Sequence, residues 1–210
     1  MQLSAEVLET EDRLSRLKKF AKLYEGYEAV LDNPGSACVD DLIILYPDAK
    51  VILTKRASAT TWLDSYHGIG IELASPTFRY LTYWTPAAGS SSRLMAAWLA
   101  INAKRFNIPA KPSVALYGAH NAWMRKITPA ERLLEFEPEM GWAPLCAFLG
   151  KEVLETEYPK RNDRRPLRGI KRLGIAVSLL VYALLVFIGV LMIRYFSRPA
   201  PYVFGGFDSA

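Results

Sequence analysis

Short apolar runs alternate with longer segments of helical spacing along the chain before residue 150. The runs at 29–31, 51–53 and 133–136 end at turn-forming or charged residues, which is typical of short buried strands. Strands that alternate with helices predict an α/β fold with a parallel sheet flanked by helices. The expected helices are 8–23, 37–45, one that carries Trp62 and Ser65, 91–106, 114–126 and 142–149.

Two charged residues follow the first two predicted strands. Asp32 comes directly after the run at 29–31, and Arg56 lies just past the run at 51–53. The carboxyl ends of parallel strands meet at one edge of a sheet, and ligands of open α/β sheets bind outside that edge. We therefore expect Asp32 and Arg56 on the same rim of the sheet.

One segment near the C-terminus is long and apolar enough to cross a membrane. Leu173–Ile193 contains no charged residue in 21 positions, and about 20 apolar residues span the hydrocarbon core of a bilayer. The alternative is a fully buried core helix, but such helices rarely run this long without a charged side chain. We predict a single-pass transmembrane helix at 173–193, preceded by a basic linker at 160–172 and followed by a short tail at 194–210.

The distribution of charge predicts the orientation of this helix. Seven basic residues against one acidic residue give 160–172 a net charge of +6, whereas the domain at 1–159 carries −2. By the positive-inside rule the domain is expected in the cytosol, and the late position of the span predicts tail-anchored insertion. A nearly neutral domain does not indicate binding to nucleic acid, although the whole chain is basic.

Three stretches of the sequence resemble a known family. Residues 41–56 (DLIILYPDAKVILTKR), 62–65 and 119–150 are similar to the sulfotransferase-like family of P-loop proteins found in fungi and other eukaryotes. The resemblance covers about residues 20–163, and its most specific parts are YPDAKVIL and GWAPLCAFLG. It implies a P-loop-type parallel sheet and the transfer of a sulfonate from 3′-phosphoadenosine 5′-phosphosulfate to the hydroxyl or amine of a small-molecule acceptor.

The resemblance also implies which residues bind the nucleotide. The family's 3′-phosphate element resembles Arg-Asp-Pro-x-x-Trp-x-x-Ser, and the corresponding segment here runs from Arg56 through Trp62 to Ser65. Trp62 and Ser65 keep the family's spacing, whereas the gap between Arg56 and Trp62 is one residue longer and the Asp-Pro pair is absent. Arg56 and Ser65 are therefore the candidates for the 3′-phosphate. The alternatives are a solvated rim charge and a hydroxyl on a helix surface.

Asp32 is the candidate catalytic base. Cytosolic sulfotransferases place a histidine two residues before a proline at a strand end, and Asp32 has the matching position before Pro34. A carboxylate needs a raised pKa to act as a base near neutral pH. An Asx-turn or a helix-capping role is the alternative for this residue. His120 is expected to pack within its helix, and two isolated histidines do not predict a metal site.

The phosphate-binding loop is the missing part of this pattern. Gly-x-x-x-x-Gly-Lys-[Ser/Thr] occurs nowhere in the 210 residues, although the resemblance implies such a loop around the 5′-phosphosulfate. The chain is therefore expected to begin after the first strand and loop, to be inactive by itself, and to expose a sheet edge that invites self-association. Two functions remain open: a membrane-anchored sulfotransferase-like protein, or a non-catalytic membrane-anchored interaction module on the same fold.

Overall fold

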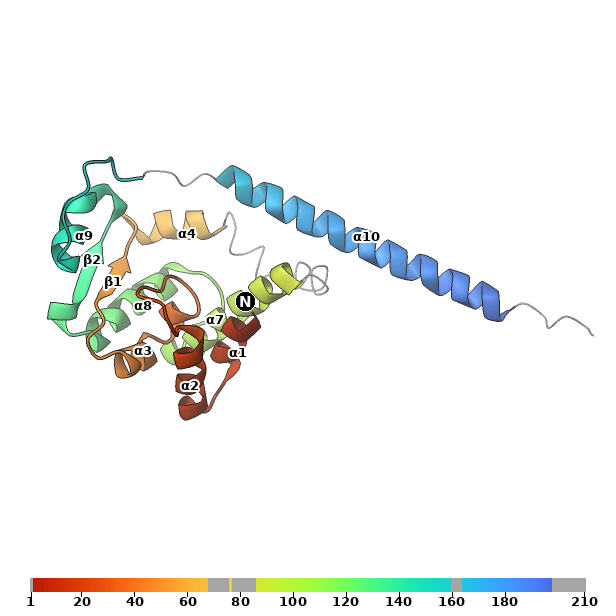
Figure 1. Ribbon diagram of the computed structural model, residues 1–210, viewed down its shortest axis with the longest axis horizontal. Coiled ribbons are helices and arrows are strands. Elements are labelled where there is room, and N and C mark those ends of the chain that lie inside the picture. Colours follow the sequence, from red (N-terminus) through yellow and green to blue (C-terminus); the bar gives the residue numbers. More distant parts are fainter. Residues whose placement is uncertain (1, 68–75, 77–85, 160–163, 198–210) are drawn as a thin grey trace, which may run out of the picture.

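The structure is a computed structural model that describes residues 2–67, 76, 86–159 and 164–197. Helices surround a small sheet in the part before residue 160, and one long helix, α10 (Arg164–Phe196), extends away from them (Figure 1). The predicted class, an α/β fold with a parallel sheet flanked by helices and one apolar C-terminal helix, is confirmed.

The sheet consists of two parallel strands in the described part of the chain. β1 (Val51–Thr54) pairs with β2 (Leu133–Phe136), and Val51 lies opposite Leu133. Both strands form where the apolar runs predicted them. Parallel neighbours need a long crossover connection, and here that connection is helical.

The strand predicted at 29–31 is wrong. The segment has no regular secondary structure, and Val30 and Leu31 are 40% and 90% exposed. An apolar run shows that a segment suits a sheet, but a strand forms only beside a partner. Among the described residues, β1 has β2 as its partner and the segment at 29–31 has none.

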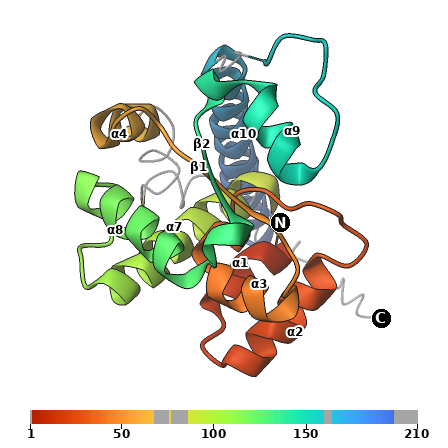
Figure 2. The ribbon, with the colours of Figure 1, turned by 90° about the vertical axis from the view of Figure 1, so that its left-hand side faces the viewer.

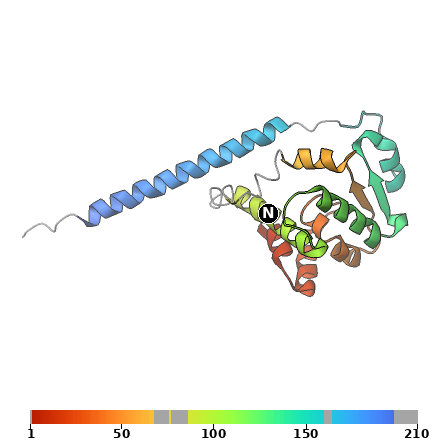
Figure 3. The same cartoon turned by 180° about the vertical axis from the view of Figure 1, so that it is seen from behind.

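The helix predicted at 8–23 is two helices, α1 (Gln2–Glu9) and α2 (Arg13–Leu23). The chain breaks between them because Asp12 caps α2: its carboxylate accepts a hydrogen bond from the backbone N–H of Ser15 at 2.8 Å. Such a cap satisfies an otherwise unpaired N–H of the first turn. α1 then packs against α7 (Pro86–Phe106), beside which the N-terminus lies (Figure 3).

Two predicted irregular segments are partly helical. The loop predicted at 68–90 lies mostly outside the described residues, but its last five residues belong to α7, which begins at Pro86. Proline is favourable at the first position of a helix, so a composition typical of loops concealed a helix start. The linker predicted at 160–172 is likewise helical from Arg164 onward.

The remaining helices form as predicted, and α8 (Val114–Ile127) and α9 (Trp142–Leu149) match their expected bounds to within one residue. α8 and α9 lie on opposite sides of the two strands (Figure 2). The helices are α3 (Val39–Leu45), α4 (Ala59–His67), α8 (Val114–Ile127) and α9 (Trp142–Leu149), with short 3-10 turns at Gly35–Ala37, Ala130–Arg132 and Pro138–Met140.

The main core cluster joins the N-terminal helices to α7 and α8. Phe20, Trp98 and Leu116 are buried in it, together with Cys38. Both cysteines, Cys38 and Cys146, are free and buried. Burial raises the pKa of the Cys38 thiol to about 11, so this thiol is protonated at neutral pH and packs as a small apolar side chain.

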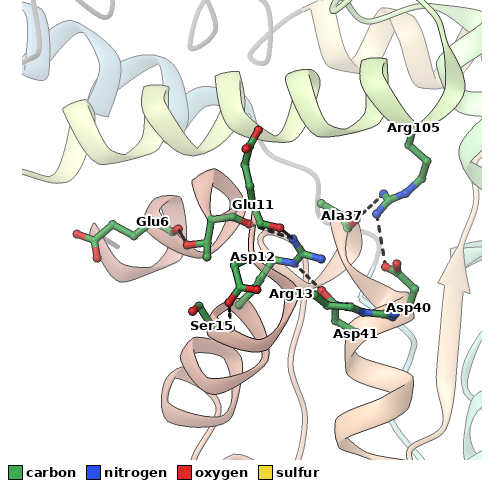
Figure 4. Close-up of polar contacts among 11 residues, drawn as sticks. Glu6, Glu11, Asp12, Arg13, Ser15, Ala37, Asp40, Asp41 and Arg105 are labelled. Atoms are coloured by element: carbon green, nitrogen blue, oxygen red, sulfur yellow. Dashed lines mark hydrogen bonds and ion pairs between the residues drawn. The ribbon is translucent and has the colours of Figure 1, made fainter.

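A buried carboxylate joins α2 to α3. Asp41 is fully buried and accepts hydrogen bonds from Arg13 Nε at 2.8 Å and from Arg16 Nε at 2.6 Å (Figure 4). Next to this pair, Arg105 of α7 donates a hydrogen bond to the carbonyl of Ala37 at 2.6 Å. A buried charge costs several kcal/mol unless it is paired, so the two guanidinium groups are required for Asp41 to lie here.

α10 presents an apolar surface over most of its length. The segment Arg172–Phe196 has a mean hydropathy of 2.8, and 6% of its most apolar window is buried. In the described part of the chain it is the one helix long and apolar enough to cross a membrane. A core helix of a soluble domain would be mostly buried, so the alternative of a buried core helix does not fit this structure.

Replacing Asp41 with alanine is expected to lower the free energy of unfolding by about 3 kcal/mol. This is the lower end of the range for breaking a buried ion pair, because the side chain of Arg13 is 52% exposed and can return to water. Thermal unfolding of the full chain in detergent micelles, followed by circular dichroism, measures the effect. Asp40→Ala is the matched control, since Asp40 is 34% exposed and lies 3.4 Å from Arg105; an equal loss in both variants would contradict the role of Asp41.

Candidate functional site

A cavity of about 530 Å³ lies along β1. Its lining includes all four residues of the strand, Val51–Thr54. Consecutive side chains of a strand point to opposite faces, so a cavity that touches all four follows the edge of the strand. β2 occupies one edge of β1, and the cavity follows the other. Leu31 and Asp32 line it from the loop before α3.

Asp32 lies in the lining of this cavity, in a turn of unusual backbone geometry. Its φ is +59°, a left-handed conformation that aspartate tolerates better than most residues. The turn is held by the backbone, since the N–H of Ser36 donates to the carbonyl of Asp32 at 2.9 Å, and by the hydroxyl of Ser36, which donates to Asn33 Oδ1 at 2.6 Å. No other described residue makes a hydrogen bond with the Asp32 carboxylate, so the side chain is not used in an Asx-turn.

The backbone of Arg56 is fixed by a tyrosine of α8. The N–H of Arg56 donates to the hydroxyl of Tyr117 at 3.0 Å, and that hydroxyl donates to the carbonyl of Arg56 at 3.2 Å. This pair of contacts positions the residue just past the carboxyl end of β1. The Arg56 guanidinium makes no ion pair with any residue that the structure describes.

Lys55, the cation next to Arg56 in the sequence, is paired with carboxylates. Lys55 Nζ lies 2.6 Å from Glu135 Oε2, and Arg125 also donates to that carboxylate, at 2.8 Å through Nη2. The hydrogen bonds from Arg125 and Lys55 lower the pKa of Glu135 to about 2. Arg56 is therefore the cation at this strand end whose charge is available to a ligand.

α4 carries the other two residues of the predicted element. Ser58 begins the helix, because its hydroxyl accepts a hydrogen bond from the N–H of Thr61 at 3.0 Å. The ring of Trp62 packs on that of Tyr117, with 5.3 Å between centroids, and lines the cavity. Ser65, one turn further along, is half-buried and lies outside the lining.

The structure thus brings only part of the predicted set together. Asp32 and Trp62 line one cavity, whereas Arg56 and Ser65 lie outside its lining, at the end of β1 and on α4. Among the described residues, no hydrogen bond joins Arg56 to Ser65. A small ligand in the cavity and a phosphate at the strand end would occupy neighbouring places, because β1 runs from one to the other.

His120 packs against the turn that carries Asp32. Its Nε2 lies 3.0 Å from the carbonyl of Ser36, and its ring contacts that of Trp123 with 5.7 Å between centroids. Burial lowers the pKa of His120. The neutral ring lines the cavity, and its Nε2 donates to this carbonyl in the tautomer that carries a proton there.

Sequence reasoning missed Tyr117 and Trp98. Tyr117 holds the backbone of Arg56, and Trp98 of α7 lines the cavity although it is only 8% exposed. Its indole N–H has no hydrogen-bond partner among the described residues. Helical spacing places both residues on helices, but only tertiary packing shows that they meet β1. The described residues contain no group of three side chains that could ligate a metal ion.

Comparison with known proteins gives the family. Residues 1–167 match the family described as "Sulfotransferase domain". A relative from Aspergillus versicolor, the Ava biosynthesis cluster protein M, is 34% identical over 153 residues, which cover 68% of this chain and 56% of the relative. The chain belongs to the sulfotransferase domain family, as the resemblance predicted, and it spans just over half the length of this relative.

Proposed function

We propose that this chain binds 3′-phosphoadenosine 5′-phosphosulfate at the carboxyl end of β1 and directs the sulfonate to a small-molecule acceptor in the adjoining cavity. The observation that carries the proposal is the placement of an unpaired cation and an unbonded carboxylate beside one strand. Arg56 follows the strand with its guanidinium free of ion pairs in the described part of the chain. Asp32 lines the cavity along the same strand.

Each residue then has one task. Arg56 and Ser65 bind the 3′-phosphate through charge-assisted hydrogen bonds, and the donor supplies the activated sulfonate. Asp32 accepts the proton of the acceptor's hydroxyl, which makes the oxygen a better nucleophile. Tyr117 and Trp62 are positioning residues, because Tyr117 fixes the backbone of Arg56 and Trp62 orients α4.

The 5′-phosphosulfate needs a binding element that these 210 residues do not contain. No Gly-x-x-x-x-Gly-Lys-[Ser/Thr] loop is present. One lost hydrogen-bond donor to developing charge typically costs about 3 kcal/mol of transition-state stabilisation, and a whole loop supplies several. The chain by itself is therefore inactive in this proposal, and a phosphate-binding segment from outside these residues restores turnover.

The proposal places the domain on a membrane. The exposed apolar surface of Arg172–Phe196 supports an anchor of this kind, and the charge of +6 in 160–172 supports a cytosolic domain under the positive-inside rule.

A non-catalytic interaction module is the alternative function. The observation that favours it is the edge of β1 along the cavity, where no described strand pairs. Unpaired strand edges accept a strand from another chain, and a second copy of this protein would give self-association. Concentration-dependent dimers of the detergent-solubilised chain, lost when Ile52 is replaced by proline in the same edge, would support this alternative.

Nucleotide binding is expected to depend on Arg56. In a calorimetric titration of the solubilised full chain with 3′,5′-phosphoadenosine, Arg56→Ala should weaken binding by about 1.5–3 kcal/mol, as for a lost hydrogen bond to a charged group. Ser65→Ala should weaken it by about 1 kcal/mol. Lys126→Ala is the control, because Lys126 is an exposed cation at the last turn of α8, near the other end of the strands. Binding that is unchanged in Arg56→Ala and Ser65→Ala removes both residues from the site.

Turnover of the sulfonate donor is expected to require an added segment. The purified chain should stay well below about 1 s⁻¹, the lower end of ordinary enzyme rates. Addition of the N-terminal part of a longer relative should raise the rate, and Asp32→Asn in that mixture should lower it by about 10²–10⁴-fold. A transfer assay measures both. A rate of about 1 s⁻¹ or more from the chain alone would show that the phosphate loop is dispensable.

The C-terminal helix is expected to anchor the protein with its domain in the cytosol. Deletion of 173–210 should move the protein to the soluble fraction after a wash with high salt and carbonate, since salt screens the attraction of 160–172 to lipid. A glycosylation acceptor placed after Ala210 should be modified, and one near Met1 should not. A truncated chain that stays in the washed membranes would rule out the anchor.

A further inference from the structure

We infer that residues 28–31 are a strap that docks onto the open edge of β1 and thereby keeps a ligand out of the cavity. In the structure the strap is undocked and lies at the rim of the cavity, where Val30 and Leu31 belong to the lining. This regulation acts on the ligand site of the proposed function and rests on it in that respect.

The strap has few contacts of its own. Residues 25–32 are all exposed, with Leu31 at 90%, and residues 28–31 make no hydrogen bond with any described residue. Gly26 and Asp32 flank the strap with φ of +79° and +59°, so the chain turns at both ends. An exposed segment without hydrogen bonds changes position at low cost, and burial of Leu31 favours a docked position.

The open edge of β1 presents the backbone groups of Ile52 and Thr54. In a parallel sheet the backbone groups of successive residues point to opposite neighbours. The N–H of Lys55 donates to the carbonyl of Phe136 in β2 at 2.8 Å, so the residues two and four positions before Lys55 also face β2. Ile52 and Thr54 therefore face the cavity, where no described strand pairs with them.

Tyr117 marks the end of this open edge. Arg56 is the next residue whose backbone points the same way as Thr54, and both its N–H and its carbonyl are bonded to the Tyr117 hydroxyl, at 3.0 and 3.2 Å. The hydroxyl takes the place of a pairing strand at this residue. A docked strap therefore pairs with Ile52 and Thr54 and ends before Arg56, and four residues suffice for this, as they do for β2.

The connection between the strap and β1 suits parallel neighbours. Parallel strands need a crossover of a dozen or more residues, usually with a helix, and the connection at 32–50 contains α3. Val39 of α3 and Leu53 of β1 belong to one buried cluster, so the helix of this crossover is already in place. Docking then extends the sheet by one strand through movement of the strap.

Docking and ligand binding exclude each other, because both use the space beside β1. Docking gains backbone hydrogen bonds and buries Leu31, but it fixes the backbone of four residues. These contributions oppose each other and are of similar size, so both positions are populated. A ligand that binds the open position shifts the population toward it, and its apparent affinity is reduced by the fraction of chains that are open.

Hydrogen exchange of single amides in the full chain, in micelles, detects the docked strap. Leu31→Asp should speed exchange at Ile52 and Thr54 by at least about threefold, because a charged side chain resists burial and the docked population falls. The amides of Val51 and Leu53 are the internal control, since they bond to β2 and should keep their rates. Equal rates at Ile52 and Thr54 in the unmodified chain and in Leu31→Asp would overturn the inference.

Exclusion of a ligand is tested by locking the strap with a disulfide between Leu31→Cys and Thr54→Cys. Neighbouring strands lie about 4.8 Å apart, within the separation that a disulfide spans, and the native Cys38 and Cys146 are buried. The oxidised variant should bind 2-naphthol at least about tenfold more weakly than the same variant after reduction, with empty micelles to subtract partitioning. The single variant Leu31→Cys, treated with the same oxidant, is the control and should bind as before.

A double variant that does not oxidise, or that binds 2-naphthol equally in both redox states, would overturn the inference. If the unmodified chain does not bind 2-naphthol at all, the ligand site of the proposed function fails, whereas the exchange rates at Ile52 and Thr54 still decide whether the strap docks. No nucleotide is added in either experiment, so the outcome for Arg56 with 3′,5′-phosphoadenosine is independent of both.

Discussion

The position of the candidate site depends on the buried carboxylate of Asp41. This side chain is held by Arg13 and Arg16 from α2, and it lies in the first turn of α3. Negative charge is also favourable at a helix N-terminus, so the pairing fixes both the start of α3 and its contact with α2. Arg105 holds the same region from α7, through the carbonyl of Ala37. The turn that begins at Asp32 ends in this region.

The size of the sheet is the second constraint. With two strands in the described residues, β1 has one paired edge and one edge that faces a cavity. The backbone groups along an unpaired edge remain available to water, a ligand or another strand. The same feature therefore underlies both the proposed acceptor cavity and the alternative of an interaction module, and the oligomeric state of the chain separates the two.

The sequence predicted elements better than it predicted contacts. The strands at 51–54 and 133–136 were found from their apolar runs, and α8 and α9 from helical spacing. The run at 29–31 has the same local pattern but no strand beside it, and a local pattern contains no information about the partner. Helix ends were missed where the cause is one side chain, as with the cap at Asp12.

In the candidate site, too, some residues were found from the sequence and others only from the tertiary contacts. Arg56 lies just past the carboxyl end of β1, where the apolar run at 51–53 placed it. Asp32 reaches the cavity along β1 from a loop, because the strand predicted at 29–31 does not form. Tyr117 and Trp98 could not be found in this way, since they come from α8 and α7 and meet β1 only through packing. The roles of Asp32, Arg56 and Ser65 remain predictions that the proposed measurements address.

The charges at the end of β1 limit what this chain can bind without help. Glu135 and Glu137 pair with Lys55, which leaves Arg56 as the cation at this strand end that has no ion pair among the described residues. One charge-assisted hydrogen bond contributes about 1.5–3 kcal/mol, whereas a dissociation constant of 1 µM requires about 8 kcal/mol. In the proposed site, Arg56 and Ser65 together contribute about 2.5–4 kcal/mol, which corresponds to a dissociation constant of about 1 mM or weaker. A donor held long enough to react needs the further phosphate contacts that a loop of consecutive N–H groups supplies. This deficit in binding energy is the physical reason why we propose that the isolated chain is inactive.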